Sequence, residues 1–228
     1  MRVSVVVPTY NEEKNIGRCL DSLINQEEKA DEIIVVDNNC IDKTVEIVKK
    51  YQGVRIIKEK KQGIAHARNA GFNNATSEIL ARCDADAIMP PDWIKKLKRD
   101  FKEKKEIVAV APFFYIFDMP SVSKSKLPGK AFYAISKLIL RTPSLVGPSM
   151  AIRKSAWEKV KDKVCVDDDR VHEDIDLSIH ISRYGEIYQD ESIIFKLSGR
   201  RIKFNPLSFF VEYPWILVRM LYSHRHLY

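Results

Sequence analysis

The sequence predicts an α/β fold built on one doubly wound, mostly parallel sheet. Short apolar runs rich in β-branched residues alternate with segments whose apolar residues recur at helical spacing, the order expected of parallel strands joined by right-handed crossovers. The first run, 2–8, is apolar almost throughout, as in strands covered on both faces. Several runs end in polar residues, and such sheets bind ligands beyond the carboxyl ends of their strands. The pattern therefore predicts a binding edge together with the fold.

Composition narrows the class of protein. The 228 residues, 45% of them hydrophobic, are enough for one domain with a sizeable core. The net charge of +7 comes from Lys and Arg interspersed with Glu and Asp, so anionic small molecules or a membrane surface are expected partners and nucleic acid is not. Four scattered cysteines predict neither a zinc site nor disulfides, and without a signal peptide we expect a cytoplasmic location.

The elements of the first half follow from the same two patterns. Ile16, Cys19, Leu20 and Leu23 recur on one face of a helix expected over 12–26. The helix expected over 64–74 carries small residues on its inner side. In chain order the other expected elements are strands at 31–37 and 54–59, an apolar strand from 79 that ends before Asp84, and helices at 44–51 and 92–104.

The second half is less regular. A helix over 172–184 ends at Gly185, a residue that often follows the last turn. Periodicity weakens after residue 196, and no strand is predicted beyond Gly185. The other expected elements are a strand at 107–117, a surface loop at 120–128, helices at 131–140 and 154–160, and an extended segment at 145–152.

The segment ILARCDADAIMPPDW, residues 79–93, organises the chain. Asp84 and Asp86 are two apart, so in extended chain both carboxylates point the same way just past a strand. Carboxylates held this close repel one another unless a cation lies between them, and hard oxygen ligands suit Mg²⁺ or Mn²⁺. The alternative is a solvated acidic turn before a helix with Asp92 as N-cap. Polar residues at 8–10 and 37–39, expected at the same edge, favour the metal site.

Six segments in this order resemble the metal-dependent glycosyltransferases of family 2. They are VVVPTYNEEKNI, EIIVVDNNCIDKT, GIAHARNAGF, ARCDADAIMPPDW, GPSMAIRKSAW and HEDIDLSIHISRYG, and they cover most of residues 1–187. The resemblance implies the GT-A fold as a single domain over 1–228. Within it we expect a Rossmann-like half that binds the nucleotide sugar at 1–110, an acceptor-binding half at 111–203 and an amphipathic C-terminal segment at 204–228.

The resemblance also assigns roles to residues. It implies that Asp84 and Asp86 hold Mn²⁺ or Mg²⁺ and that Asp174, paired with Glu173, is the catalytic base. Acidic residues in a first helical turn are also common for stability alone, and for Arg68 the alternative is an exposed arginine on a helix surface. The residues expected to bind the nucleotide sugar are Pro8, Thr9, Tyr10, Glu12, Asp37, Asn39, Arg68 and Asp84.

The implied activity is sugar transfer with inversion from a nucleoside diphosphate sugar to a hydroxyl group of a saccharide or lipid-linked glycan. A UDP-sugar is favoured, but Asn38 stands where the family often has an acidic residue, so the base stays open. Alternatives are transfer to a polyprenyl phosphate and a nucleotide-sugar-binding protein without turnover. A nucleotidyltransferase fits less well, because PTYNEE replaces the Gly-rich loop expected there. The third metal ligand is also open, since IFKLSGRR contains no histidine.

The C-terminal segment 204–228 combines many aromatic side chains with arginines and histidines, as at a membrane interface. Pro206, Glu212, Pro214 and Arg219 interrupt it, so no run reaches the roughly 20 apolar residues that a spanning helix needs. We expect peripheral docking on the inner face of the cell membrane. The alternative is packing on the chain's own core or on a second subunit in a homodimer.

Overall fold

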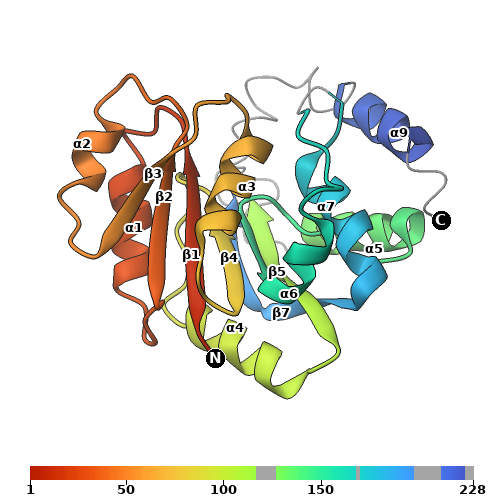
Figure 1. Cartoon of the computed structure of the whole chain (residues 1–228). Helices are drawn as coiled ribbons and strands as arrows, with labels where there is room; N and C mark the ends of the chain where they lie inside the picture. The colour runs from red at the N-terminus through yellow and green to blue at the C-terminus, as the bar shows by residue number, and fades with distance from the viewer. Residues whose placement is uncertain (117–126, 168–169, 198–211, 224–228) are drawn as a thin grey trace.

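The computed structural model describes residues 1–116, 127–167, 170–197 and 212–223, and within them a seven-stranded sheet of order β3-β2-β1-β4-β6-β5-β7 (Figure 1). All neighbouring strands are parallel except β6, which is antiparallel to both β4 and β5. The predicted doubly wound, mostly parallel sheet is confirmed. The strands are β1 (Val3–Thr9), β2 (Glu32–Asp37), β3 (Val54–Lys58), β4 (Ile79–Cys83), β5 (Ile107–Ile116), β6 (Ser149–Arg153) and β7 (Glu186–Leu197).

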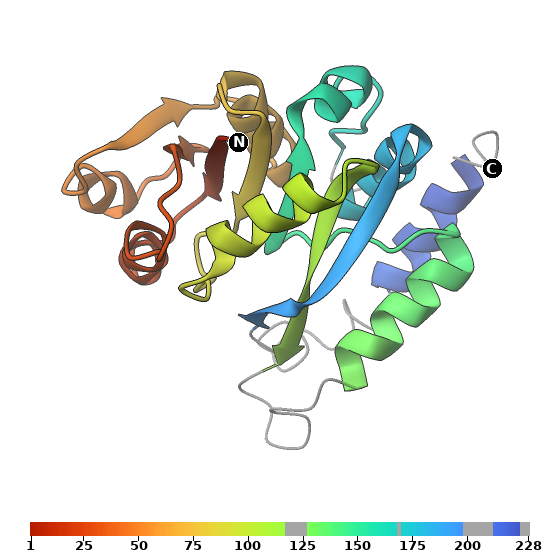
Figure 2. The same cartoon turned by 90° about the horizontal axis from the view of Figure 1, so that it is seen from below.

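Helices cover both faces of the sheet, as the two views show (Figures 1 and 2). On one face α3 packs against α6 through the edge-to-face rings of Phe72 and Trp157. On the other face the side chain of Gln26, just after α1, accepts a hydrogen bond from the backbone of Ile94 in α4. The helices are α1 (Ile16–Ile24), α2 (Thr44–Val48), α3 (Ile64–Asn74), α4 (Trp93–Glu103), α5 (Leu127–Leu140), α6 (Lys154–Val160), α7 (Glu173–Ile181) and α9 (Tyr213–Ser223), with a 3₁₀ turn η1 (Ser182–Tyr184) after α7.

The small residues of α3 let this helix approach the sheet closely. A Cβ atom added to Gly71 would lie 2.1 Å from Cγ1 of Val6 and 3.1 Å from Cγ2 of Val36, so no side chain fits there. Ala67, one turn earlier, is buried as well. The predicted inner side of this helix is confirmed, and α3 has the predicted bounds. The close packing holds α3 over β1 and β2 and directs its Arg68 into the interior.

Two local expectations differ from the structure. Strand β7 was not predicted, because the polar residues 189–192 interrupt its apolar pattern where the pairing with β5 shifts register between Pro112 and Phe113. Helix α5 begins at Leu127, four residues before the expected start and inside the expected loop. The remainder of that loop lies outside the described residues. So do Arg200 and Arg201, and residues 204–211 and 224–228 of the predicted C-terminal segment, which include His224 and His226.

Candidate active site

Five elements bring polar residues to one edge of the sheet. Strands β1, β2 and β4 are parallel, so their carboxyl ends meet there, and Asp84 directly follows β4. Strand β6 runs the opposite way and begins at the same edge, with Ser149 opposite Cys83. The N-terminus of α7 joins them, because Asp174 accepts a hydrogen bond from the backbone of Gly147, just before β6. We call this the ligand edge.

Asp84 and Asp86 both lie half-buried at the ligand edge. Oδ1 of Asp84 accepts hydrogen bonds from Nε and Nη2 of Arg82 at 3.0 and 2.9 Å. Burial raises the pKa of Asp84, and the negative charge of Asp86 raises it further. A carboxyl that resists ionisation beside a second acidic side chain suits a bound cation, whose charge would stabilise both carboxylates. The donor set therefore fits a divalent metal.

The described residues contain no group of three or more His, Cys, Asp or Glu side chains that could hold a metal ion. Two carboxylates can supply only part of an octahedral set. Mg²⁺ and similar ions usually complete it with water and with phosphate oxygens of the substrate. Nε2 of His180 lies 3.7 Å from Oδ1 of Asp176 on the same helix. Among the described residues, no third side chain of these four types joins Asp84 and Asp86 in such a group.

Arg82 connects this acidic pair to α7. Its side chain is almost fully buried, and besides Asp84 it forms an ion pair with Glu173. Glu173 forms a second ion pair, with the fully buried Arg68 of α3. Burial favours protonation of Glu173, but the positive charges of Arg82 and Arg68 outweigh it and lower the pKa of this carboxyl. We call these four side chains the ionic network: Arg68, Arg82, Asp84 and Glu173.

Asp174 follows Glu173 in the first turn of α7. Its Oδ2 accepts the hydrogen bond from the Gly147 amide at 2.9 Å, and its Oδ1 accepts one from the Ile175 amide at 2.8 Å. Burial raises the pKa of Asp174, and the neighbouring charge of Glu173 raises it further. A carboxylate with a raised pKa is a better proton acceptor than an exposed one, provided that it is still ionised at the working pH. This environment suits a general base.

Gly147 leaves room for this arrangement. An added Cβ would lie 3.2 Å from Nη2 of Arg82 and 3.5 Å from both Oδ2 of Asp174 and Oε1 of Glu173. A side chain at this position would crowd the Arg82 guanidinium and touch the carboxylates of Asp174 and Glu173. Sequence reasoning assigned no role to Gly147 or Arg82. Arg82 had a visible signal, because it is a charged residue in the otherwise apolar strand ILARC.

The residues predicted to bind the base and ribose follow β1 and β2. Tyr10 comes directly after β1 and is 51% exposed. Asp37 ends β2, and its Oδ1 accepts a hydrogen bond from the Cys40 amide at 2.8 Å. The remaining members are Pro8 and Thr9 in β1, Glu12 in the turn before α1, whose amide binds Thr44 Oγ1, and Asn39 with φ 66° after β2.

Two predicted positions make structural contacts. The Asn38 side chain binds the backbone of Glu59, Lys61 and Gly63, so it holds the loop that leads into α3. Arg68 is fully buried and contacts Glu173, and is not exposed on the helix surface. Its expected position beside the phosphates or ribose stays a prediction.

Comparison with known proteins identifies the family of this chain. The sequence model described as "Glycosyl transferase family 2" matches residues 4–161. The chain belongs to this family. The glycosyltransferase GlyA of Streptococcus pneumoniae is 28% identical over 136 residues, which are 58% of this chain and 20% of GlyA. The chain described here thus spans a fifth of the length of GlyA.

Solved structures share the fold. The mannosyltransferase PcManGT of Pyrobaculum calidifontis, solved with GDP-Man and Mn²⁺, has a TM-score of 0.77 at 22% identity over 99% of this chain and 64% of that one. Staphylococcus aureus TarS 1–349, solved with UDP-GlcNAc, has a TM-score of 0.71 at 20% identity over 97% of this chain and 67% of that one. At these identities the likeness shows the fold, which is GT-A as predicted.

Proposed function

We propose that this family 2 chain transfers a sugar, with inversion, from a nucleoside diphosphate sugar to a hydroxyl group of a glycan or lipid-linked acceptor. One observation carries the proposal: the ionic network links Asp84, at the predicted metal site, to the helix that holds Asp174. A transferase needs these two functions at a fixed separation, because the leaving diphosphate and the acceptor lie on opposite sides of the sugar carbon. The complexes of structural relatives with UDP-GlcNAc and GDP-Man support this class of donor.

In this proposal each carboxylate has one task. Asp84 and Asp86 would hold Mn²⁺ or Mg²⁺, and such an ion stabilises the charge of a departing diphosphate. Asp174 takes the proton from the acceptor hydroxyl while the oxygen attacks the sugar carbon and the bond to the diphosphate breaks. Arg82 and Glu173 position the two sides relative to each other and do not touch the reacting atoms.

The nucleotide would lie along the ends of β1 and β2. Tyr10 is exposed enough to stack on a base, and Asp37 has a second carboxylate oxygen for a base N–H. A UDP-sugar is the favoured donor. Arg68 contributes through Glu173, its partner in the interior.

The test is a thermal-shift panel of UDP-, GDP- and dTDP-sugars with Mn²⁺, followed by donor hydrolysis and transfer assays. A ligand that binds only the native state raises its stability by mass action. We expect one class of donor to raise the Tm in the presence of Mn²⁺, and EDTA or Asp86→Ala to abolish both the shift and turnover. The matched control, Asp162→Ala, removes an exposed carboxylate outside the site and should behave like the parent. Full turnover by Asp86→Ala in EDTA would contradict the proposal, and donor binding without turnover would favour a binding protein.

A further inference from the structure

Helices α5 and α9 lie on the same side of the molecule, far from strands β1 and β2 (Figure 2). Each uses one face for packing. Leu140 of α5 and Met220 of α9 are buried in one small apolar cluster with Val171 and Ile179, and Leu217 and Leu221 of α9 pack against that cluster. Helix α9 therefore packs on the protein through its inner face, which leaves its outer face exposed.

The outer faces of these helices carry large apolar side chains that are exposed. Elsewhere in the described part of the chain, only Ile41 and Tyr10 among large hydrophobic residues are more than half exposed. Such concentration in one region marks an interaction surface. The residues of this outer face are Leu127 (72% exposed), Ile135 (56%) and Leu138 (82%) on α5, and Trp215 (67%), Val218 (58%) and Tyr222 (68%) on α9.

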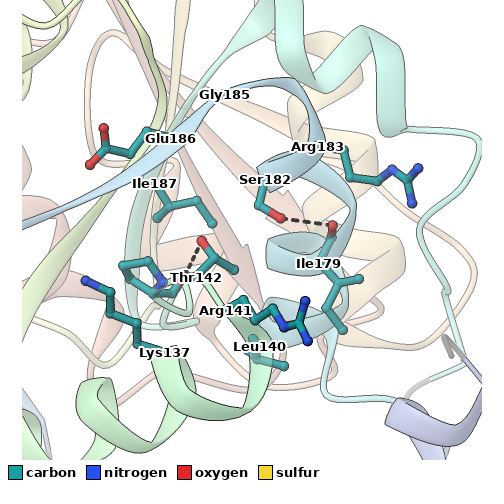
Figure 3. A pocket seen from close by; sticks show the side chains of 11 residues that line it. Lys137, Leu140, Arg141, Thr142, Ile179, Ser182, Arg183, Gly185, Glu186 and Ile187 are labelled. Carbon is teal, nitrogen blue, oxygen red and sulfur yellow. Dashed lines mark hydrogen bonds between the residues drawn. The ribbon is translucent and has the colours of Figure 1, made fainter. Parts of the chain in front are cut away.

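The charged residues within the two helices are all basic, and one exposed carboxylate, Glu212, lies directly before α9. Neither α5 nor α9 contains an Asp or Glu residue. The exposed cations are Lys130 and Lys137 on α5, Arg141 directly after it, and Arg219 on α9. A cavity of about 570 Å³ adjoins the same small cluster, since Leu140 and Ile179 line both. Lys137, Arg141 and Arg183 surround this cavity together with one carboxylate, Glu186 (Figure 3).

We propose that the outer face of α5 and α9 docks on an anionic membrane surface, with its apolar side chains in the interfacial layer and its cations at the lipid phosphates. Apolar residues flanked by an excess of cations are complementary to anionic lipid. The helices have 14 and 11 residues, short of the roughly 20 that span a bilayer, so they would lie in the interface. None of the described helices is both long and apolar enough to cross a membrane.

A second copy of the chain is a weaker occupant. In a twofold dimer the same patch faces itself, so the cations of α5 and α9 would meet like charges with no carboxylate of either helix between them. The proposal therefore specifies which residues make the membrane contact expected of 204–228. Within the described residues, α9 packs on the core and presents Trp215 outward, and α5, which carried no such expectation, supplies the other half of the surface.

The docked face is linked to the site through α7. Asp174 lies in the first turn of this helix, and Ile179, two residues from its end, is in the cluster beneath α9. Nine helical residues span only about 13 Å. A lipid-linked acceptor held in the membrane would therefore be close to the base, an inference that rests on the proposed function.

Co-sedimentation with vesicles tests the docking without any donor or metal. The full chain should pellet with phosphatidylcholine vesicles that contain phosphatidylserine, and added salt should weaken the binding. Two double variants should each reduce the partition at least about tenfold: Leu138→Ser with Trp215→Ser, and Lys137→Glu with Arg141→Glu. The matched controls, Ile41→Ser and Lys49→Glu with Lys50→Glu, change exposed residues of the nucleotide half and should bind like the parent.

Equal binding by the parent and both double variants would overturn the proposal, as would absence of binding to anionic vesicles. A dimer in light scattering that the Leu138→Ser, Trp215→Ser variant abolishes, without vesicle binding by the parent, would assign the face to a second copy and also overturn it. Vesicle binding with failed sugar transfer would contradict the proposed function alone, so the two failures are distinguishable.

Discussion

Two clusters of buried charge lie in different parts of the molecule and balance their charges differently. The ionic network at the ligand edge sets the buried Arg68 and Arg82 against Glu173 and Asp84. The second cluster lies between α4 and β7, where Arg99 forms ion pairs with Asp100 and Asp190. In the second cluster one cation, 40% exposed, serves two buried carboxylates.

The difference lies in what neutralises the excess negative charge. Between α4 and β7 a proton does so below about pH 6: burial raises the pKa of Asp100 to about 6, and its hydrogen bond with Asp190 adds to this effect. At the ligand edge, Asp86 and Asp174 add to Asp84 and Glu173, so with all four carboxylates ionised the negative charges exceed the two guanidinium groups by two. The divalent cation of the proposed function would match that excess. Similar buried aspartates thus point to a ligand site in one place and, in the other, to a structural pair that takes up a proton below about pH 6.

The largest effect is expected where the charged group has a chemical task. Asp174→Asn keeps the shape of the side chain and removes the proton acceptor. Donor binding should survive, and transfer should fall by roughly 10²–10⁴-fold. Since the pKa of Asp174 is raised, the parent's kcat/KM should also decline as the pH falls through that pKa and the carboxylate is protonated. The measurements are transfer rates against pH and donor affinity by thermal shift.

The same readouts separate catalysis from helix capping. Acidic residues in a first helical turn stabilise the helix, so a merely structural Asp174 would lower the Tm and leave transfer per folded molecule unchanged. Asp162→Asn, a change at an exposed site, gives the baseline for both quantities. Unaltered transfer by Asp174→Asn would remove this residue from the mechanism.

The next effect concerns Glu173, which joins the two arginines. Glu173→Gln leaves Arg68 and Arg82 buried with one negative charge fewer, and breaking a buried pair in this way typically costs about 3–5 kcal/mol. We expect a loss of that size in the free energy of unfolding, measured with urea. Glu191→Gln, at an exposed position of β7, should change it by less than about 0.5 kcal/mol. A loss below about 1 kcal/mol for Glu173→Gln would mean that water already compensates the network.

The comparison also explains what the sequence could and could not predict. Asp84 and Asp86 were recognisable because a buried strand ends there, and α3 because its small residues repeat on one face. The link from Arg82 to Glu173 joins residues 91 apart, and no local pattern encodes such a contact. Strand β7 and its Asp190 were missed for a related reason: the polar residues of its register shift hide the strand from a pattern of alternating burial.

The C-terminal region shows a similar limit. Aromatic and basic residues predicted an interfacial segment, but sequence alone could not separate an inner from an outer face. The structure does so for α9, where Met220 is buried and Trp215 exposed. It also places α5 on the same side (Figure 1), a pairing of segments more than 70 residues apart that only the fold creates.

The smallest effect is expected in the second cluster, where Asp100→Asn should increase the free energy of unfolding above pH 6. The folded-state pKa of Asp100, about 6, lies above its ordinary value of 3.8. The folded protein therefore binds this proton more tightly than the unfolded chain. The stability that the proton contributes is complete below about pH 4 and is lost as the pH rises through about 6. Asp100→Asn cannot ionise and should escape this loss.

We expect the free energy of unfolding of Asp100→Asn, relative to the parent, to rise by about 1–3 kcal/mol between pH 5 and pH 8. Asp190 does not obscure the difference. Although burial raises its pKa, hydrogen bonds from Ser192 lower it overall, so it titrates below this window. Urea unfolding at both pH values, with Asp162→Asn as the exposed control, measures the effect. Parallel pH dependence in the parent and Asp100→Asn would show that Asp100 is ionised throughout, and the contrast between a proton in one cluster and a cation in the other would then fail.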